Sequence, residues 1–519
     1  MLITQGVRRA AQVNRSGIAT IDGERKHTWS EFAGRVARLA GALQGLGVEK
    51  GGRIATLAFN SDRYLEYFFA IPWAGGMIVP LNTRLAPKEL AYMLHDAGVQ
   101  ILVVDEAHIE VVPAITADAA SIKHIIYAGD QTAPDGFLYH EAIISAAQPI
   151  PDTTESGDDV AGIFYTGGTT GQPKGVMLTH RNIVSNALVS LLNIYEGKPM
   201  TYLHSAPMFH IADCQWNMGV TLHAGTHVFM PKFVPEEMLE AIEKFRVTHC
   251  ALVPTMVNML CNLNGRENYD VSTLRGINYG GSPMPPPLIA RAREAFPHCR
   301  FFQGYGQTET APNVSMLTDQ YHVLEGPKAG KVGSAGQPVF TMEVRIVDPD
   351  DSELPQRKIG EITARGPNVM AGYWNRPEET AHALRGGWMH TGDLGYMDED
   401  GFLYIVDRLK DMIITGGENV YSAEVESVIY QHAAVAVCAV FGIPDEKWGE
   451  SIHAVIVPKE GQTVTGDEII ALCREHIAGY KCPRTVEITT EPLPMSGAGK
   501  ILKRDLRRPY WEGKERGVN

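Results

Sequence analysis

The chain is poor in the features that mark several large protein classes. It has only seven cysteines in 519 residues, and no two of them form a C-x-x-C pair. This scatter argues against a disulfide framework and a structural zinc site, so we expect a reducing compartment. Basic residues are fewer than acidic ones, 46 against 60, and the net charge is -14. Such a charge disfavours a nucleic-acid binder, because the protein as a whole repels phosphate backbones.

Long apolar runs are also lacking. The most apolar stretch, residues 68–81, is interrupted by two prolines and two glycines and is shorter than the ~20 residues that a membrane-spanning helix needs. Residues 1–14 contain two arginines but no apolar segment of the kind that follows them in a signal peptide. We therefore expect a cytoplasmic protein without a membrane span, and a transient contact with a membrane surface stays open.

The pattern of apolar residues predicts an α/β fold. Residues 28–46 have apolar positions at helical spacing, and short apolar runs such as 52–57, 99–105 and 123–127 alternate with helical segments. This alternation predicts mainly parallel sheets covered by helices. A β-rich section follows over residues 330–408, and a small α/β unit follows from residue 411. We predict a large N-terminal domain, 1–408, that includes the β-rich part, and a small C-terminal domain, 409–519.

The most informative segment is residues 165–175, Tyr-Thr-Gly-Gly-Thr-Thr-Gly-Gln-Pro-Lys-Gly. It follows the strand-like run 160–164 and precedes a helical segment that starts at Thr179, so we expect a loop between strand and helix. Its glycines let backbone N–H groups approach an anion, and its threonines and lysine add donors and charge. It is not a P-loop, because Gly175 follows Lys174 where that motif has Ser or Thr. The sequence predicts a polyphosphate-binding loop, and a solvated surface loop is the alternative.

Further motifs follow in order along the chain: 279–282 (YGGS), 304–309 (GYGQTE), 388–393 (WMHTGD), 407–411 (DRLKD) and 494–500 (PMSGAGK). Together with the glycine-rich run they resemble the signatures of the adenylate-forming enzymes, which include acyl- and aryl-CoA ligases, luciferases and the adenylation domains of peptide synthetases. Gly167 stands where many members have Ser. The resemblance covers roughly residues 10 to 510 and points to the acyl-CoA synthetase branch.

The resemblance implies an ATP site. Its residues would be Thr166, Gly167, Gly168, Thr169, Thr170, Gly171, Lys174, Gly281, Ser282, Gly304, Tyr305, Gly306, Gln307, Thr308, Asp393, Arg408 and Lys500. In this reading Asp393 and Arg408 bind the ribose, while Glu309 and Thr166 hold Mg²⁺, an ion that prefers oxygen ligands. From the residues alone, Asp393 is equally a turn cap, Glu309 a surface carboxylate and Arg408 the partner of a neighbouring acid.

Two lysines would carry the catalytic cycle. A phosphate-binding loop with a distant lysine suits nucleotidyl transfer, since charge at the α-phosphate of ATP needs a cation to stabilise it. Lys500, after two glycines, is the candidate for that cation. Lys410 matches the hinge position of the family, about which the small, mobile domain rotates between adenylate and thioester formation. A solvated surface lysine is the alternative for both.

The remaining sites concern CoA and the acid. The resemblance implies CoA-binding residues Gly416, Gly417, Glu418 and Trp448, and acyl-binding residues His210, Gly281 and Gly304. Trp216, an apolar residue near His210 in the sequence, is a further candidate for the acyl pocket. Segments 205–219 and 303–313 contain no Arg or Lys. We therefore expect an apolar acid, a medium- or long-chain fatty acid in preference, with an aromatic or cyclic acid such as a hydroxycinnamate or a benzoate as the alternative. A nucleotide-binding homologue without catalysis is the competing class, and a homodimer stays open.

Overall fold

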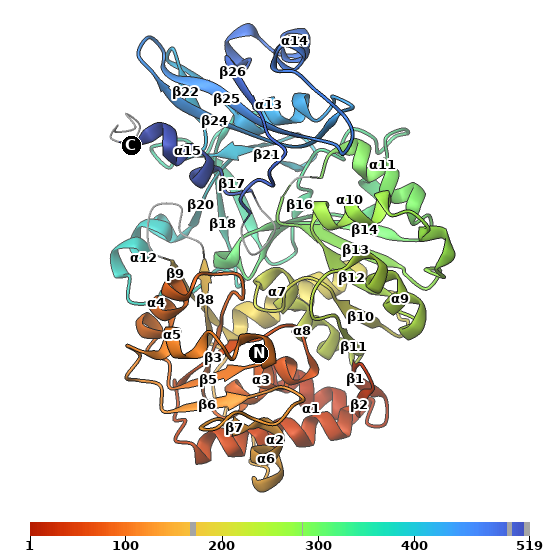
Figure 1. The fold of residues 1–519 in the computed structure, drawn as a ribbon, viewed down its shortest axis with the longest axis vertical. Coiled ribbons are helices and arrows are strands. Elements are labelled where there is room, and N and C mark those ends of the chain that lie inside the picture. The colour runs from red at the N-terminus through yellow and green to blue at the C-terminus, as the bar shows by residue number, and fades with distance from the viewer. Residues whose placement is uncertain (167–172, 283, 496–500, 513–519) are drawn as a thin grey trace. The chain divides into compact units, whose positions relative to one another are not determined.

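The computed structural model describes residues 1–166, 173–282, 284–495 and 501–512, and its fold is drawn in Figure 1. The chain divides into two compact units. The large unit comprises Met1–Glu343 and Ala364–Met389, and the small unit comprises Val344–Thr363 and His390–Asn519. The predicted boundary at residues 408/409 therefore lies inside the small unit. The predicted boundary separates the parts of the chain that we expect to rotate against each other, which is a different criterion from compactness. It stays a prediction.

The large unit contains two sheets. One has the order β19 (Gly372–Tyr373), β9 (Lys174–Thr179), β8 (Val160–Thr166), β4 (Met77–Pro80), β3 (Arg53–Leu57), β5 (Ile101–Val104), β6 (His124–Tyr127) and β7 (Leu138–Tyr139). The other has the order β16 (Gln337–Pro338), β15 (Asn313–Leu317), β14 (Arg300–Gly306), β13 (Gly276–Gly280), β12 (His249–Leu252), β10 (Thr201–His204), β11 (Thr226–Phe229), β1 (Ile18–Asp22) and β2 (Arg25–Thr28). The central strands of both sheets are parallel.

Helices cover these sheets. They are α1 (Ile3–Val13), α2 (Trp29–Gly45), α3 (Asp62–Trp73), α4 (Pro87–Ala97), α5 (Val112–Thr116), α6 (His140–Ala146), α7 (His180–Ile194), α8 (Ile211–His223), α9 (Pro235–Phe245), α10 (Pro254–Asn262), α11 (Pro286–Ala295) and α12 (Pro377–Ala383). The predicted helix over 28–46 is confirmed as α2, which begins where the Thr28 hydroxyl accepts a hydrogen bond from the N–H of Glu31. None of the described helices is long and apolar enough to cross a membrane.

The small unit is built around two further sheets. The first has the order β17 (Glu343–Val347), β18 (Gly360–Arg365), β20 (Met389–Met397) and β21 (Leu403–Arg408). The second has the order β23 (Glu418–Val420), β22 (Ile413–Thr415), β25 (Gly449–Pro458) and β24 (Val435–Asp445), with β26 (Thr485–Ile488) also paired to β25. Its helices are α13 (Ser422–Ile429), α14 (Gly466–His476) and α15 (Lys503–Trp511). Short 3₁₀ turns lie at Glu106–His108, Arg266–Asn268, Thr308–Thr310, Asp319–Tyr321, Arg385–Gly387 and Gly479–Lys481.

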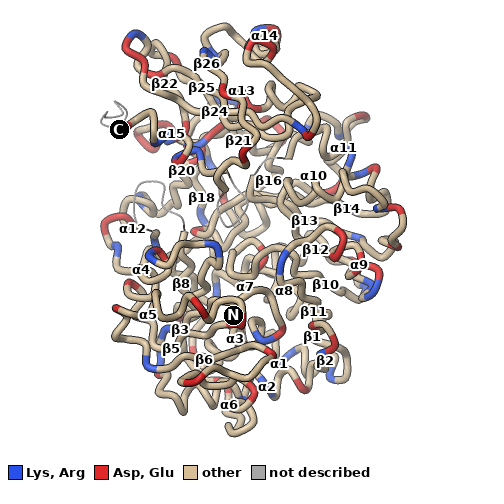
Figure 2. Tube along the Cα trace, viewed as in Figure 1, with Lys and Arg blue, Asp and Glu red and all other residues tan. Residues whose placement is uncertain are grey.

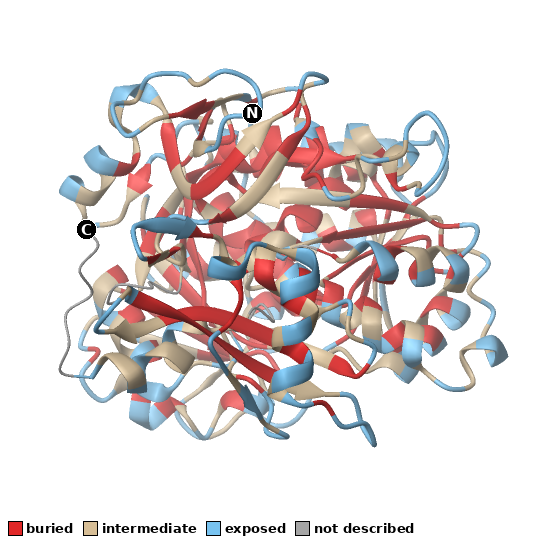
Figure 3. Ribbon diagram, turned by 90° about the horizontal axis from the view of Figure 1, so that it is seen from above, coloured by how far each residue is buried: buried red, intermediate tan, exposed pale blue. Residues whose placement is uncertain are grey.

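Burial follows the layers. Strands are mostly buried and the exposed positions lie on helices and loops, as Figure 3 shows. Acidic and basic residues are interspersed along the chain (Figure 2). All seven cysteines are free thiols; six are buried and Cys261 is half-buried. The predicted fold class, helix-covered mainly parallel sheets with a β-rich part and a small α/β C-terminal part, is confirmed.

Candidate active site

The glycine-rich run joins two strands. Predicted strand 160–164 is confirmed as part of β8, which ends at Thr166, and β9 begins at Lys174. These two strands are antiparallel, with Thr166 opposite Lys174. The prediction of a loop between strand and helix was therefore wrong: the apolar residues after Lys174 form a buried strand before α7 begins. The predicted phosphate-binding residues Gly167, Gly168, Thr169, Thr170 and Gly171 lie outside the described residues.

One tyrosine contacts two of the predicted site residues. Tyr373 of β19 donates a hydrogen bond of 2.9 Å from its hydroxyl to Glu309 Oε1, and the Lys174 ammonium lies 5.1 Å from its ring centroid. Burial and the neighbouring Glu309 raise the pKa of Tyr373, so the phenol stays protonated as a donor. Glu309 is only 7% exposed, and the N–H of Met370 donates to its carbonyl oxygen. Glu309 is thus a buried, oriented carboxylate, which differs from a solvated surface acid.

Glu309 and Thr166 are suitable ligands for Mg²⁺. Both supply oxygen atoms, which this ion prefers. Within the described part of the chain, no three His, Cys, Asp or Glu side chains gather as a metal site.

Glycines allow β14 to lie close to β13 on one side and to the segment that begins β15 on the other. A Cβ added at Gly280 would lie 2.6 Å from the carbonyl oxygen of Gly304, and one at Gly304 would lie 2.7 Å from Asn313 Oδ1. At Gly306, where φ is +157°, it would lie 1.7 Å from the oxygen of Pro312. Close packing of the backbone therefore requires these glycines even without a ligand. Tyr305 continues β14, and Gln307 and Thr308 follow it in the turn that carries Glu309.

Predicted acyl and adenine residues lie at the ends of elements in the large unit. Gly281 and Ser282 are exposed and directly follow β13, and Gly281 has a left-handed φ of +81°. The carboxyl ends of parallel strands are where ligands bind in such sheets. His210 is the N-cap of α8, where its Nδ1 accepts from the N–H of Ala212 at 3.2 Å. His210 therefore has a structural role as a helix cap. Its predicted contact with the acid substrate stays a prediction.

Trp216 is a core residue of α8. It is 1% exposed and stacks on Tyr202 of β10 with 5.2 Å between ring centroids. Its indole N–H has no hydrogen-bond partner within the described part of the chain. The Tyr202 hydroxyl donates to Asp213 Oδ1 at 2.9 Å. Because Asp213 and Trp216 both belong to α8, this hydrogen bond holds Tyr202 against the helix that carries Trp216.

The small unit brings Asp393 and Arg408 together. They face each other across the β20–β21 pair, and Arg408 Nε lies 3.3 Å from Asp393 Oδ1. Asp393 is buried while Arg408 is exposed. A buried carboxylate with a cation beside it can accept hydrogen bonds from a diol such as the ribose hydroxyls. The ion pair agrees with the alternative reading of Arg408 as the partner of a neighbouring acid, and its contact with the ribose stays a prediction.

Of the two predicted catalytic lysines, the structure describes Lys410 and not Lys500. Lys410 is half-buried and lies in the turn between β21 and β22, where the N–H groups of Asp411 and Met412 both donate to the carbonyl of Arg408. Lys500 lies outside the described residues. Met495 and Ile501, which are described on either side of it, form an antiparallel bridge.

The predicted CoA-binding residues also lie together in the small unit. Gly416 and Gly417 have left-handed φ values of +62° and +83° in the turn between β22 and β23, and Glu418 is exposed after them. The N–H of Gly416 donates to the Trp448 carbonyl at 2.8 Å. Two cations lie over the Trp448 ring, Lys447 at 4.7 Å and Arg484 at 4.5 Å from its centroid. Positive charge beside an aromatic face suits the phosphates and the adenine of CoA.

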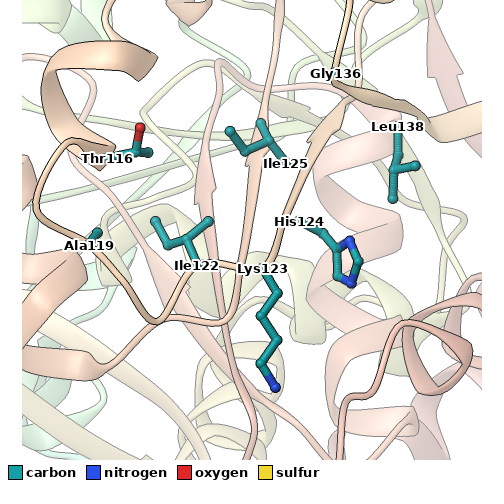
Figure 4. A pocket seen from close by; sticks show the side chains of 8 residues that line it. All are labelled: Thr116, Ala119, Ile122, Lys123, His124, Ile125, Gly136 and Leu138. Atoms are coloured by element: carbon teal, nitrogen blue, oxygen red, sulfur yellow. The ribbon is translucent and has the colours of Figure 1, made fainter.

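A separate pocket of about 300 Å³ lies at the edge of the β8 sheet (Figure 4). It is lined by Thr116, Ala119, Ile122, Lys123, His124, Ile125, Gly136 and Leu138, all of which lie outside the motifs.

The motif residues that the structure describes lie at the ends of strands and in turns of both units, with Glu309 buried in the large unit and Asp393 paired with Arg408 in the small one. The sequence matches the AMP-binding enzyme family over residues 7–374 and the AMP-binding enzyme C-terminal domain over residues 424–500. The chain belongs to this family.

Individual relatives show the class of reaction. The chain is 42% identical over 503 residues to a feruloyl-CoA synthase of Amycolatopsis sp, covering 97% of this chain and 98% of the relative. Among solved structures it is similar to o-succinylbenzoate CoA synthetase of Bacillus subtilis with an acyl-adenylate intermediate, at TM-score 0.85, 31% identity and 99% coverage of each chain. It is also similar to a fatty acyl CoA synthetase of Mycobacterium tuberculosis, at TM-score 0.78, 32% identity and 99% coverage of each chain. The protein is an AMP-forming acid–thiol ligase, which uses ATP and CoA.

Proposed function

We propose that this ligase activates an aromatic carboxylic acid, a hydroxycinnamate or a substituted benzoate, in preference to a fatty acid. The feruloyl-CoA synthase, which shares the most sequence with this chain among the proteins compared above, acts on an acid of that kind by its name. The lack of Arg and Lys in segments 205–219 and 303–313 suits a fatty acid and an aromatic acid equally. The observation that carries the proposal is a buried amide, Asn278, in the second sheet of the large unit.

The strand register places Asn278 on the α8 side of this sheet. Ile277 and Phe301 pair across β13 and β14 and belong to the apolar cluster on one face. Because neighbours along a strand alternate in direction, Asn278 lies on the opposite face with its partner Phe302. Tyr202 of β10 also lies on that opposite face, where it stacks on Trp216 of α8. Gly280 and Gly304, two residues further along each strand, share it too.

Asn278 carries a buried donor that a substrate can satisfy. It is 8% exposed, and its Nδ2 has no hydrogen-bond partner within the described residues. A buried polar group left unpaired costs ~1–3 kcal/mol. A phenol or methoxy oxygen on an aromatic acid would accept from this amide, whereas a methylene chain would leave it unpaired. The buried amide thus favours an acid with an oxygen substituent.

The reaction follows from the residues in their proposed roles. The acid's carboxylate attacks the α-phosphate of ATP, and pyrophosphate leaves. Lys500 stabilises the charge that develops at that phosphate, while Asp393 and Arg408 hold the ribose. Mg²⁺, held by Glu309 and Thr166 with the phosphates, would neutralise negative charge on the nucleotide when bound. The CoA thiol then attacks the acyl carbon, AMP leaves, and the thioester is released.

The CoA step belongs to the small unit in this proposal. Rotation about Lys410 brings the segment Gly416–Glu418 to the adenylate, and the left-handed glycines leave room for the pantetheine arm. Trp448 with its two cations binds the nucleotide part of CoA. We expect the reaction to take place in the cytoplasm, and self-association of the chain remains an expectation.

A panel of acids tests the proposal. AMP formation would be measured with ATP, Mg²⁺ and CoA for ferulate, 4-hydroxycinnamate, cinnamate, benzoate, octanoate and palmitate. We expect the highest kcat/KM with a hydroxylated or methoxylated aromatic acid. A fatty acid is the second candidate, which the similarity to the fatty acyl CoA synthetase favours. A higher kcat/KM for octanoate or palmitate than for every aromatic acid would select that second candidate.

A further inference from the structure

The carboxamide of Gln215, on α8, lies at the centre of a buried group of polar side chains in the large unit. Its Oε1 accepts three hydrogen bonds, from Asn186 Nδ2 at 2.8 Å, from the Ser190 hydroxyl at 2.9 Å and from Asn313 Nδ2 at 2.9 Å. Its Nε2 donates to the Ala212 carbonyl at 3.0 Å. All four polar side chains are buried. The group therefore joins α7, which carries Asn186 and Ser190, to α8 and to the start of β15.

Asn313 connects this group to the turn that carries Glu309. It is the first residue of β15 and pairs with Gly306, the last residue of β14, and the turn 307–312 lies between these two strands. The backbone N–H of Asn313 donates to Asn186 Oδ1 at 3.0 Å. The end of the turn is thus anchored on α7 through the backbone of Asn313, and on α8 through its side chain.

A second segment, residues 367–373, is anchored on the same group. Its Asn368 is fully buried and donates from Nδ2 to the carbonyl of Asn313 at 3.1 Å and to Asn186 Oδ1 at 3.4 Å. This segment also supplies the backbone N–H and the tyrosine hydroxyl that donate to Glu309. The buried amides therefore hold both the turn that carries Glu309 and the segment that contacts it.

Stability alone does not require a buried group of this kind. Replacing both partners of a buried hydrogen bond by apolar groups of the same shape can leave the stability nearly unchanged. A fully satisfied network has a different property, because its donors and acceptors fit together in one arrangement and so specify a unique packing. The packing that is specified here places the Glu309 turn relative to α8, whose N-cap is His210, the predicted contact of the acid.

We propose that Gln215 is a positioning residue for adenylate formation, which holds the turn of the proposed magnesium ligand and the helix of the proposed acid contact in one arrangement. It acts through the three side chains that donate to it. The proposal rests on the proposed function in one respect, the roles of Glu309 toward Mg²⁺ and of α8 toward the acid. Glu309→Gln tests the first of these roles by itself, so the two proposals can fail separately.

The test compares Gln215→Met with Gln215→Glu. Methionine has a similar length and removes the acceptor, whereas glutamate keeps an oxygen for all three donors and loses only the donation to Ala212. ATP–pyrophosphate exchange would be measured over a range of Mg²⁺ concentrations and of concentrations of the best acid of the panel. We expect Gln215→Met to raise the half-saturating Mg²⁺ concentration and the KM of the acid by roughly 10- to 100-fold each. Gln215→Glu should restore most of this loss, whereas a smaller folded fraction alone would lower only the apparent kcat.

Ser190→Ala is a milder variant of the same group, which answers the question even where Gln215→Met does not fold. It removes one of the three donors, so both concentrations should rise by roughly 2- to 10-fold. Tyr67→Phe is the matched control. Tyr67 is buried in α3, and its hydroxyl lies 3.0 Å from His140 Nδ1, so its loss should alter stability and leave both concentrations unchanged.

Two outcomes would overturn the positioning role of Gln215. One is an unchanged Mg²⁺ dependence and acid KM in the methionine and Ser190→Ala variants, and the other is an equal rise in Tyr67→Phe. An Mg²⁺ dependence that stays unchanged in Glu309→Gln would instead overturn the proposed role of Glu309. The KM of the acid in the Gln215 variants would then still test the positioning of α8.

Discussion

The hydroxyl of Tyr373 donates a 2.9 Å hydrogen bond to Glu309 Oε1. Tyr373 is in β19, a two-residue edge strand that pairs with β9 and so lies beside the end of the glycine-rich run. A carboxylate held this way has one oxygen engaged by a protonated phenol. The pairing of β19 with β9 therefore determines the orientation of the proposed magnesium ligand.

Tyr373→Phe should weaken adenylation. A hydrogen bond to a charged group contributes ~1.5–3 kcal/mol, so we expect a decrease of roughly 10- to 100-fold in ATP–pyrophosphate exchange. The Mg²⁺ concentration needed for half-maximal exchange should also rise. Tyr127→Phe, which removes a hydroxyl that accepts from the Gln131 N–H, is the control. Unaltered Mg²⁺ dependence would show that Tyr373 does not orient a metal ligand.

Lys500→Ala should abolish adenylate formation and spare the thioester step from a supplied acyl adenylate. Removing a group that stabilises transition-state charge costs ~10²–10³ in rate. ATP–pyrophosphate exchange and CoA-dependent release of AMP from the synthetic adenylate measure the two steps separately. Lys459→Ala, at an exposed lysine of the small unit, is the control. Normal exchange in Lys500→Ala would refute the assignment.

Lys410→Pro should reduce thioester formation more than adenylation, because proline fixes the backbone angle that a hinge must change. Lys410→Ala removes the side chain but keeps that freedom, and it should leave the ratio of the two half-reactions near that of the wild type. Both variants would be assayed by the two separate measurements described for Lys500. Equal loss of both half-reactions in the proline variant would indicate general damage to the small unit.

Asn278→Leu should change the preference among acids. Loss of the amide removes the donor for an oxygen substituent, so kcat/KM for 4-hydroxycinnamate should fall by roughly 5- to 100-fold. Unsubstituted cinnamate has no such oxygen and serves as the internal control, with a small loss or a gain. An equal decrease for both acids would mean that Asn278 has a structural role and does not determine the choice of acid.

Much of this enzyme is predictable from local sequence. Periodicity predicts α2, and short apolar runs predict β3, β5 and β6, because each signal lies within one element. The β9 strand was missed because its six residues follow the glycine-rich run directly and form a strand only by pairing with β8 and β19. The same limit applies to Tyr373, which lies 64 residues from Glu309.

The other missed residues depend on register or on distant partners. Asn278 lies on the α8 side of its sheet because β13 pairs in one register, and an isolated asparagine beside the YGGS motif gives no sign of this. Gln215 lies in a segment recognised for the acid, yet its hydrogen bond with Asn186 depends on the packing of α8 against α7. Arg484 joins Trp448 through the fold of the small unit. Motif order thus predicts the class of enzyme, and tertiary contacts determine the residues that orient the motifs.

The buried cysteines have a consequence for an enzyme that makes acyl adenylates. Such an intermediate reacts with thiolates, and a protein thiolate within reach would become acylated in place of CoA. Burial raises the pKa of all seven thiols, including that of half-buried Cys261. A smaller fraction of these thiols is therefore ionised at neutral pH than of an exposed cysteine. Burial in this way lowers the tendency of the protein to acylate itself and favours the thiol of the second substrate.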